Sequence, residues 1–169
     1  PSCKYLSEPL LFFKGFKSLQ SHRVASWLWE NSRHTLAHYF QSRTSEVYGV
    51  DIHPAAKLGK GIMIDHGTGV VIGETSVIKD NVSIFQGVTL GGTGKETGDR
   101  HPKVMEGVLL SASSTVLGNV QIGRNAKIAA GSVVLEDVKE GTTVAGVPAK
   151  EVSQAVDNVP ADDIDHLIE

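Results

Sequence analysis

Two short polar segments contain the side chains best suited to chemistry. The first reads DHGTG at residues 65–69, and the second reads GGTGKETGDRHPK at residues 91–103. The imidazole of His66 can take a proton from a substrate at neutral pH, because the reference pKa of histidine is about 6.5. General-base help of this kind is typically worth ~10²–10⁴-fold in rate. His66 is therefore the first candidate catalytic residue.

Two other patterns match known sites less well. The segment LGGTGKET resembles a phosphate-binding loop, but Thr89 stands in place of its first glycine and Glu96 in place of the hydroxyl residue after Lys95. A mobile lid over a substrate is the better interpretation. His34 and His38 lie four residues apart, as two metal ligands on a helix would. No third ligand accompanies them, so we expect exposed helix residues.

The elements that must position these residues follow two patterns. From about residue 8 to 48, apolar residues recur every three to four positions, which predicts a helical hairpin with a break and a new N-cap at Asn31 and Ser32. After residue 48, aliphatic residues recur every six positions, each followed four residues later by a small or β-branched residue such as Ala56 or Thr68. Stacked coils of three such hexads would bury the aliphatic side chains in a parallel β-helix. These positions are Ile52, Leu58, Ile64, Ile72, Ile78, Ile84, Leu90, Val104, Leu110, Val116, Ile122, Ile128 and Val134.

The repeat is interrupted at the two polar segments, which gives a geometric prediction. Counting three hexads per coil, Asp51 precedes the first hexad and His66 begins a corner one coil later, so we expect both on one edge. A carboxylate beside an imidazole fixes its tautomer and stabilises the imidazolium. A surface ion pair or a turn-capping aspartate is the alternative. Arg100 and His101 leave from a different corner, so we expect three subunits packed side by side to form interfacial sites.

Composition and charge limit the classes of function. The 169-residue chain has 16 basic and 19 acidic residues, and its net charge of −3 gives no basic field for nucleic acid or anionic lipid. No apolar run is long enough to cross a bilayer, and the first residues lack a secretory signal pattern. The single cysteine, Cys3, fits a reducing compartment. We therefore expect a cytoplasmic protein with no nucleic-acid or membrane partner.

Four segments together resemble the serine O-acetyltransferases, a branch of the left-handed β-helix acyltransferases. They cover nearly the whole chain and read PLLFFKGFKSLQSHRVASWLW, VDIHPAAKLGKGIMIDHGTGVVIGE, VTLGGTGKETGDRHPK and AAGSVVLEDVKEGTTVAGVPAK. The resemblance implies a mainly β fold with α, in which a left-handed parallel β-helix follows an N-terminal helical segment. We divide the chain into the C-terminal part of a helical domain at 1–48, a catalytic β-helix at 49–150, and a flexible acidic tail at 151–169.

The resemblance also implies an activity, which is acetyl transfer from acetyl-CoA to the L-serine hydroxyl in cysteine biosynthesis, with no metal required. His66 would be the general base and Asp51 would orient its ring. Asp65 would bind the serine ammonium, Arg100 would bind its carboxylate through a bidentate fork, and His101 would contact its reacting end.

Further expectations concern the cofactor and partners. Small residues would admit the pantetheine arm of acetyl-CoA and basic residues would contact its phosphates, namely Ala112, Ala130, Gly131, Lys127, Lys150 and Arg124. The family implies a homotrimer or a hexamer of two trimers, with L-cysteine as a feedback inhibitor. A family tail that ends in isoleucine docks into O-acetylserine sulfhydrylase, whereas this chain ends Ile168-Glu169.

Other functions stay open at this point. One is a hexapeptide acetyltransferase for a sugar or xenobiotic hydroxyl. Another is a β-helix carbonic anhydrase with zinc held by His53, His66 and His101 across an interface. A third is a scaffold that only binds the sulfhydrylase.

Overall fold

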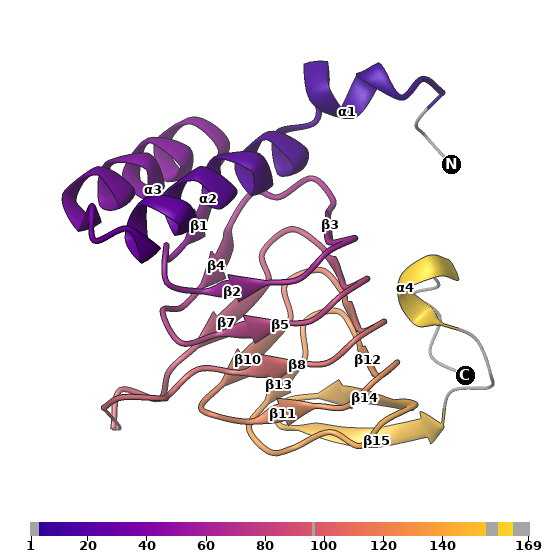
Figure 1. Ribbon diagram of the computed structural model, residues 1–169. Helices are drawn as coiled ribbons and strands as arrows, with labels where there is room; N and C mark the ends of the chain where they lie inside the picture. Colours follow the sequence, from indigo (N-terminus) through magenta and orange to yellow (C-terminus); the bar gives the residue numbers. More distant parts are fainter. Residues whose placement is uncertain (1–3, 96, 155–158, 164–169) are drawn as a thin grey trace.

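Helices cover one end of a parallel β-solenoid in the computed structural model, which describes residues 4–95, 97–154 and 159–163 (Figure 1). The helices are α1 (Ser7–Phe12), α2 (Lys14–Glu30) and α3 (His34–Tyr48). The predicted hairpin and its break are confirmed, but the predicted N-cap is wrong. Arg33 occupies the N-cap position of α3 without a side-chain cap, because Ser32 adopts a left-handed φ of 59° in the turn.

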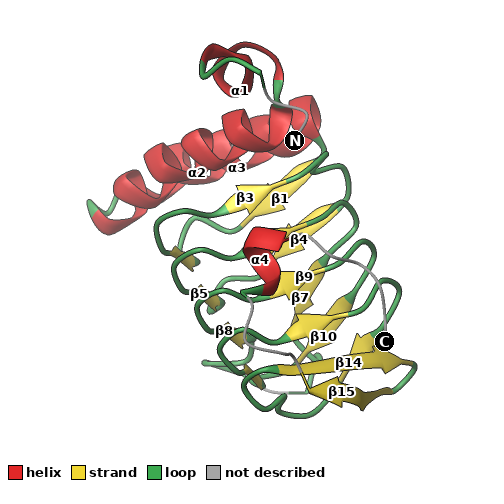
Figure 2. Ribbon diagram, turned by 90° about the vertical axis from the view of Figure 1, so that its right-hand side faces the viewer, coloured by secondary structure: helices red, strands yellow, loops and turns green. Residues whose placement is uncertain are grey.

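Three sheets of short strands form the faces of the solenoid (Figure 2). Sheet A stacks five parallel strands, sheet B four, and sheet C five parallel strands plus one antiparallel strand at its end. Each coil contributes one strand to each face until the last coils, which is the arrangement that the six-residue period predicts. Sheet A is β1 (Val50–Ile52), β4 (Val70–Ile72), β7 (Thr89–Gly91), β10 (Thr115–Leu117) and β13 (Val133–Val134); sheet B is β2 (Lys57–Leu58), β5 (Val77–Ile78), β8 (Lys103–Val104) and β11 (Gln121–Ile122); sheet C is β3 (Met63–Ile64), β6 (Ser83–Ile84), β9 (Leu109–Leu110), β12 (Lys127–Ile128), β14 (Thr142–Gly146) and β15 (Ala149–Gln154).

The interior of the solenoid is aliphatic. Twelve of the thirteen predicted hexad positions are buried, and Leu58 is partly buried against the same core. Thr68, four residues after Ile64, is exposed, and Val70 is fully buried instead. The two extra residues of the 65–69 segment shift the register here.

Regular structure continues past residue 150, where the predicted domain boundary stays a prediction. Strand β15 continues to Gln154, because its backbone pairs antiparallel with β14. A short helix, α4 (Pro160–Asp163), follows, and the Ser83 hydroxyl of sheet C donates a hydrogen bond to the Ala161 carbonyl at 3.0 Å (Figure 2). The flexible tail stays a prediction for 155–158 and 164–169, which lie outside the described residues, as do Cys3, Glu96 and the Ile168-Glu169 ending.

None of the helices in the described ranges is both long and apolar enough to cross a bilayer.

Candidate active site

His66 lies in a turn between sheets C and A. The turn joins β3 to β4, and His66 itself has a left-handed φ of 57°. Its side chain is 71% exposed, and its Nε2 lies 3.7 Å from Oδ2 of Asp65. The other oxygen of Asp65 accepts a hydrogen bond from the His66 backbone N–H at 3.0 Å. The same left-handed φ recurs at Asn81, Ser113 and Asn125, so it belongs to the turn geometry of the solenoid. The turn therefore presents the imidazole outward, where a substrate can reach it.

Helix α2 holds this turn from above. A Cβ atom at Gly15 would lie 1.9 Å from the carbonyl oxygen of Ile64, so only glycine allows the helix backbone to approach so closely. The ammonium of Lys14 donates a hydrogen bond to the Thr68 hydroxyl in the same turn. The first turn of α2 and the His66 turn thus form one packed unit.

Asp51 lies on β1, in the coil above β4, and not in the predicted register with His66. In sheet A its direct partner is Val71, and the His66 turn stacks instead against Gly49, whose carbonyl accepts the Gly69 N–H at 2.7 Å. This part of the prediction is wrong because the 65–69 segment carries two residues more than a hexad. Asp51 Oδ1 accepts a hydrogen bond from Gln41 of α3 at 2.7 Å. Its role in orienting His66 stays a prediction.

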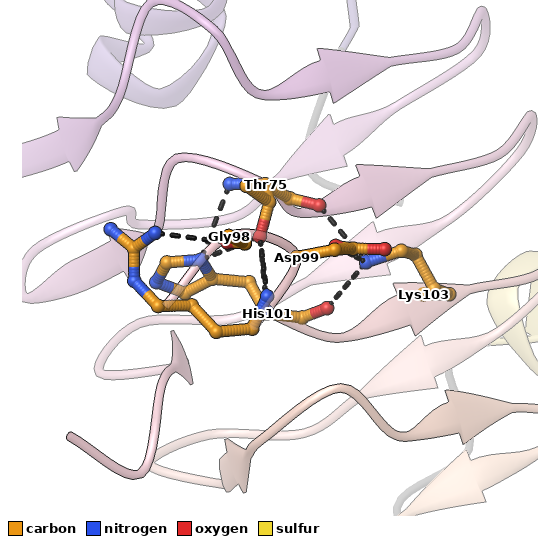
Figure 3. Close-up of polar contacts among 6 residues, drawn as sticks. Thr75, Gly98, Asp99, His101 and Lys103 are labelled. Carbon is orange, nitrogen blue, oxygen red and sulfur yellow. Dashed lines mark hydrogen bonds and ion pairs between the residues drawn. The ribbon is translucent and has the colours of Figure 1, made fainter. Parts of the chain in front are cut away.

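Arg100 and His101 end the β7–β8 connection at the corner between sheets A and B, where they lie against the β4–β5 turn of the preceding coil. The Thr75 hydroxyl accepts hydrogen bonds from both of their backbone N–H groups, at 3.0 Å and 3.1 Å (Figure 3). The ammonium of Lys103 closes the loop by donating to the Thr75 and His101 carbonyls at 3.1 Å and 2.6 Å. An insertion of eight residues is thereby tied back to the preceding coil.

The charges at this corner are partly paired. Arg100 Nη2 donates to Glu74 Oε2 at 2.8 Å, and Nη1 donates to the Gly98 carbonyl at 3.0 Å. The hydrogen bond from Arg100 lowers the pKa of Glu74, although its neighbourhood raises it slightly through desolvation. Burial lowers the pKa of His101, and the Arg100 cation lowers it further. Burial likewise lowers the pKa of His53 at the same corner. Both imidazoles are therefore held in their neutral forms near pH 7.

A cluster of rings lies one coil above this corner. Trp29 stacks on His34 with ring centroids 4.3 Å apart, and its edge meets His38 at 5.2 Å and His53 at 5.1 Å. His34 and His38 are exposed as predicted, but both pack against the indole. Within the described ranges, no three histidine, cysteine, aspartate or glutamate side chains are placed to share a metal ion.

The two halves of the predicted site lie at different corners of one chain. His66 and Asp65 stand where sheet C passes into sheet A, whereas Arg100 and His101 stand where sheet A passes into sheet B. The structure thus separates His66 from His101, as the repeat count predicts. His53 stands with His101 and not with His66.

Three of the predicted cofactor residues, Ala112, Ala130 and Gly131, share a corner with His66. Backbone hydrogen bonds stack its turn on those of the coils below, from Gly87 N to Thr68 O, from Ser113 N to Gln86 O, and from Gly131 N to Ala112 O. Ala112 is half-buried, whereas Ala130 and Gly131 are exposed. Along this edge the His66 turn is followed by Gln86 and Gly87, and then by the small residues Ala112, Ser113, Ala130 and Gly131.

The basic residues predicted for CoA phosphates differ in exposure. Lys150 is exposed on β15, and Arg124 forms an ion pair with Glu106 at 3.2 Å. Lys127, on β12, is only 6% exposed. Ser83, on the same sheet, is buried where its hydroxyl meets α4, and the hexad pattern does not reveal such burial.

Sequence reasoning missed three polar residues that hold the candidate site. They are Gln41 on α3 and the Glu74-Thr75 pair between β4 and β5. Their partners are distant in sequence, so spacing offers no signal for them. Gly73 is a fourth residue that sequence reasoning missed, and an added Cβ there would lie 2.0 Å from the His101 ring.

Comparisons with known proteins agree with this architecture. Residues 101–136 match the family model described as bacterial transferase hexapeptide (six repeats). The serine acetyltransferase of Salmonella typhimurium is 54% identical over 165 residues, which are 98% of this chain and 60% of that protein. The serine acetyltransferase of Haemophilus influenzae is 57% identical over 164 residues, which are 97% of this chain and 61% of that protein.

The chain belongs to the serine acetyltransferase family. It spans about three fifths of the length of the curated relatives that it matches.

Three solved serine acetyltransferase structures are similar to the whole fold. One in complex with cysteine has a TM-score of 0.97 and 56% identity, and the match covers 99% of this chain and 65% of that one. One from Brucella abortus in complex with coenzyme A has a TM-score of 0.91 and 53% identity, covering 92% and 62%. One from Neisseria gonorrhoeae in complex with serine has a TM-score of 0.88 and 57% identity, covering 90% and 62%.

Proposed function

We propose that this chain transfers the acetyl group of acetyl-CoA to the hydroxyl of L-serine, giving O-acetylserine and CoA, in the first step of cysteine biosynthesis. The observation that carries the proposal is the exposed His66 imidazole, held in a left-handed turn at the corner that also carries Ala112, Ala130 and Gly131. A similar protein has been solved with coenzyme A and another with serine, which supports both substrates.

In the proposed mechanism, His66 removes the serine hydroxyl proton while the oxygen attacks the thioester carbonyl. The C–S bond then breaks, and CoA leaves as its thiol after the proton is returned. Asp51 orients the ring, and Asp65 lies beside it as the partner for the serine ammonium. Acetyl-CoA runs along the corner below His66, past Ala112, Ala130 and Gly131, with Lys127 and Lys150 toward its phosphates. The reaction itself requires no metal.

The serine carboxylate is assigned to Arg100 of a neighbouring subunit. A guanidinium has five N–H donors, and the contacts with Glu74 and Gly98 use only part of them. In one chain, Arg100 and His101 stand at a different corner from His66. This separation favours a trimer in which each of three sites combines His66 of one subunit with Arg100 of the next. A hexamer of two trimers, inhibition by L-cysteine at the serine site, docking into O-acetylserine sulfhydrylase and a cytoplasmic location are proposed on the same resemblance. A relative solved with cysteine supports the inhibitor.

The first experiment measures the serine-dependent release of CoA thiol. The wild-type chain should release thiol, His66→Ala should lose about 10²–10⁴-fold in turnover, and the exposed His34→Ala should keep wild-type turnover. A screen of sugar hydroxyl acceptors, run in parallel, tests the alternative acetyltransferase. If serine elicits no thiol release, or if His66→Ala retains full turnover, the proposal is wrong.

A second experiment tests the shared site. Trimers made only of His66→Ala chains, or only of Arg100→Ala chains, should be inactive. In a mixed trimer, an interface that joins His66 of an Arg100→Ala chain to Arg100 of a His66→Ala chain has both residues intact. In trimers assembled at random from equal amounts, about one quarter of the interfaces should recover activity. No recovery on co-expression would place both residues in a single-chain site.

A further inference from the structure

The Thr75 side chain and backbone meet the same ring nitrogen of His101. The backbone N–H of Thr75 donates to His101 Nδ1 at 3.2 Å, and the Thr75 hydroxyl lies 2.9 Å from the same nitrogen (Figure 3). A backbone N–H can only donate, so Nδ1 must be an acceptor in this contact. Nδ1 therefore carries no proton.

The hydroxyl oxygen of Thr75 already accepts two hydrogen bonds. The donors are the backbone N–H groups of Arg100 and His101, at 3.0 Å and 3.1 Å. With both lone pairs used, the remaining O–H is free to donate. Nδ1 lies at hydrogen-bond distance from it, and the Asp99 carboxylate, whose pKa is lowered first by Lys103 and also by the Thr75 hydroxyl, is the competing acceptor nearby. The backbone N–H of Thr75, and its hydroxyl when turned toward the ring, thus both donate to Nδ1. The opposite tautomer would set an imidazole N–H against them, a mismatch that disfavours it by about 5- to 150-fold.

The other ring nitrogen is then a donor. Neutral imidazole with an unprotonated Nδ1 carries its proton on Nε2. The Nε2 edge of the ring lies over Gly73, where a Cβ atom would be 2.1 Å from Nε2. Among the described residues Nε2 has no hydrogen-bond partner, and it is not one of the fully enclosed polar atoms. The surface therefore offers an unpaired N–H beside Arg100.

We propose that Thr75 is a positioning residue that fixes His101 as its neutral Nε2–H tautomer, so that His101 donates a hydrogen bond to a substrate oxygen. This inference rests on the proposed function for the identity of that oxygen, which would be the reacting hydroxyl or the oxyanion of the tetrahedral intermediate. The two histidines then have separate tasks. His66 accepts the proton, and His101 cannot compete for it at Nε2.

The test is the tautomer itself, read from imidazole ¹⁵N–¹H correlation spectra of the ¹⁵N-labelled full chain at pH 7.5. The His101 signals are assigned by their loss in His101→Gln. Wild type should show a protonated Nε2 and an unprotonated Nδ1. Thr75→Val, which removes the hydroxyl but keeps the backbone N–H, should mix the tautomers and lower kcat for serine about tenfold. Thr75→Ser should restore both, and Thr115→Val on β10 should change neither.

The possible outcomes separate the two proposals. A protonated Nδ1 in wild type overturns the tautomer assignment, whatever the activity of the variants. If a folded Thr75→Val chain keeps the wild-type tautomer and kcat, the Thr75 hydroxyl does not position His101. If the wild-type chain shows the expected tautomer but does not acetylate serine, the positioning by Thr75 is supported and only the proposed function is refuted.

Discussion

Substituting Gly15 by alanine tests whether the helical layer positions the catalytic turn. Gly15 lies in the first turn of α2, and an added Cβ would lie 1.9 Å from the Ile64 carbonyl oxygen and 2.9 Å from its carbon. Carbonyl and helix are both backbone, so no side chain can rotate away. The contact must open to at least 3.0 Å, a displacement of about 1.1 Å.

Two effects of the substitution oppose each other. Alanine in place of glycine stabilises a helix by about 1 kcal/mol. Overpacking against a fixed neighbour costs typically about 1–3 kcal/mol, and a backbone clash this deep belongs at the upper end. We therefore expect a net loss of about 2 kcal/mol in the free energy of unfolding. A displacement of about 1 Å at a reacting group can lower turnover about 10²-fold. The Gly15→Ala chain should thus lose about 10²-fold in turnover while it remains folded in the absence of urea.

Urea unfolding and the thiol-release assay measure these two quantities on the same preparation. Gln20→Ala, on the exposed face of α2, is the matched control and should change the unfolding free energy by less than about 0.5 kcal/mol. A Gly15→Ala chain that is more stable than wild type and fully active would show that helix propensity prevails and that α2 does not hold the turn.

Three further predictions concern other parts of the chain. Burial lowers the pKa of His22 from 6.5 to about 4, so the neutral imidazole favours the folded state. Its contribution to the free energy of unfolding is complete above pH 6.5 and falls by about 3 kcal/mol as the pH drops to 4. The urea midpoints at pH 7 and pH 5 should therefore differ less in His22→Gln than in the wild type. Gly73→Ala would place a Cβ 2.0 Å from the His101 ring, so kcat/KM for serine should fall at least about tenfold, while an unchanged value would refute the close contact. Leu110→Ala in the fully buried core should cost about 2–5 kcal/mol in urea unfolding, against less than about 0.5 kcal/mol for Leu135→Ala, which is 51% exposed.

The six-residue period predicted most of the solenoid because burial repeats with it. An aliphatic residue at each sixth position can reach the interior only if three strands close a coil, so sheet number and core followed from spacing alone. The same count failed where the period breaks. The two extra residues in the 65–69 segment moved Thr68 outward and set Asp51 opposite Val71.

Polar contacts between distant segments could not be predicted in this way. Gln41 reaches Asp51 from a helix, and Thr75 meets His101 across an insertion. Such contacts depend on how a loop returns to the coil, and a repeat pattern contains no information about loops. The burial of Lys127 has a similar origin, because it depends on what packs outside sheet C.

The covered ends of the solenoid also determine how the molecule behaves among its own copies. A stack of parallel strands has an unsatisfied row of N–H and C=O groups at each end, which would allow copies to join into fibres. Here α2 and α3 lie over the first coil, and the antiparallel strand β15 closes sheet C at the last (Figure 1). The helices thereby block growth at the first coil and β15 ends the parallel stack of sheet C at the last, which leaves the outer faces of sheets A and B for lateral packing into a closed ring.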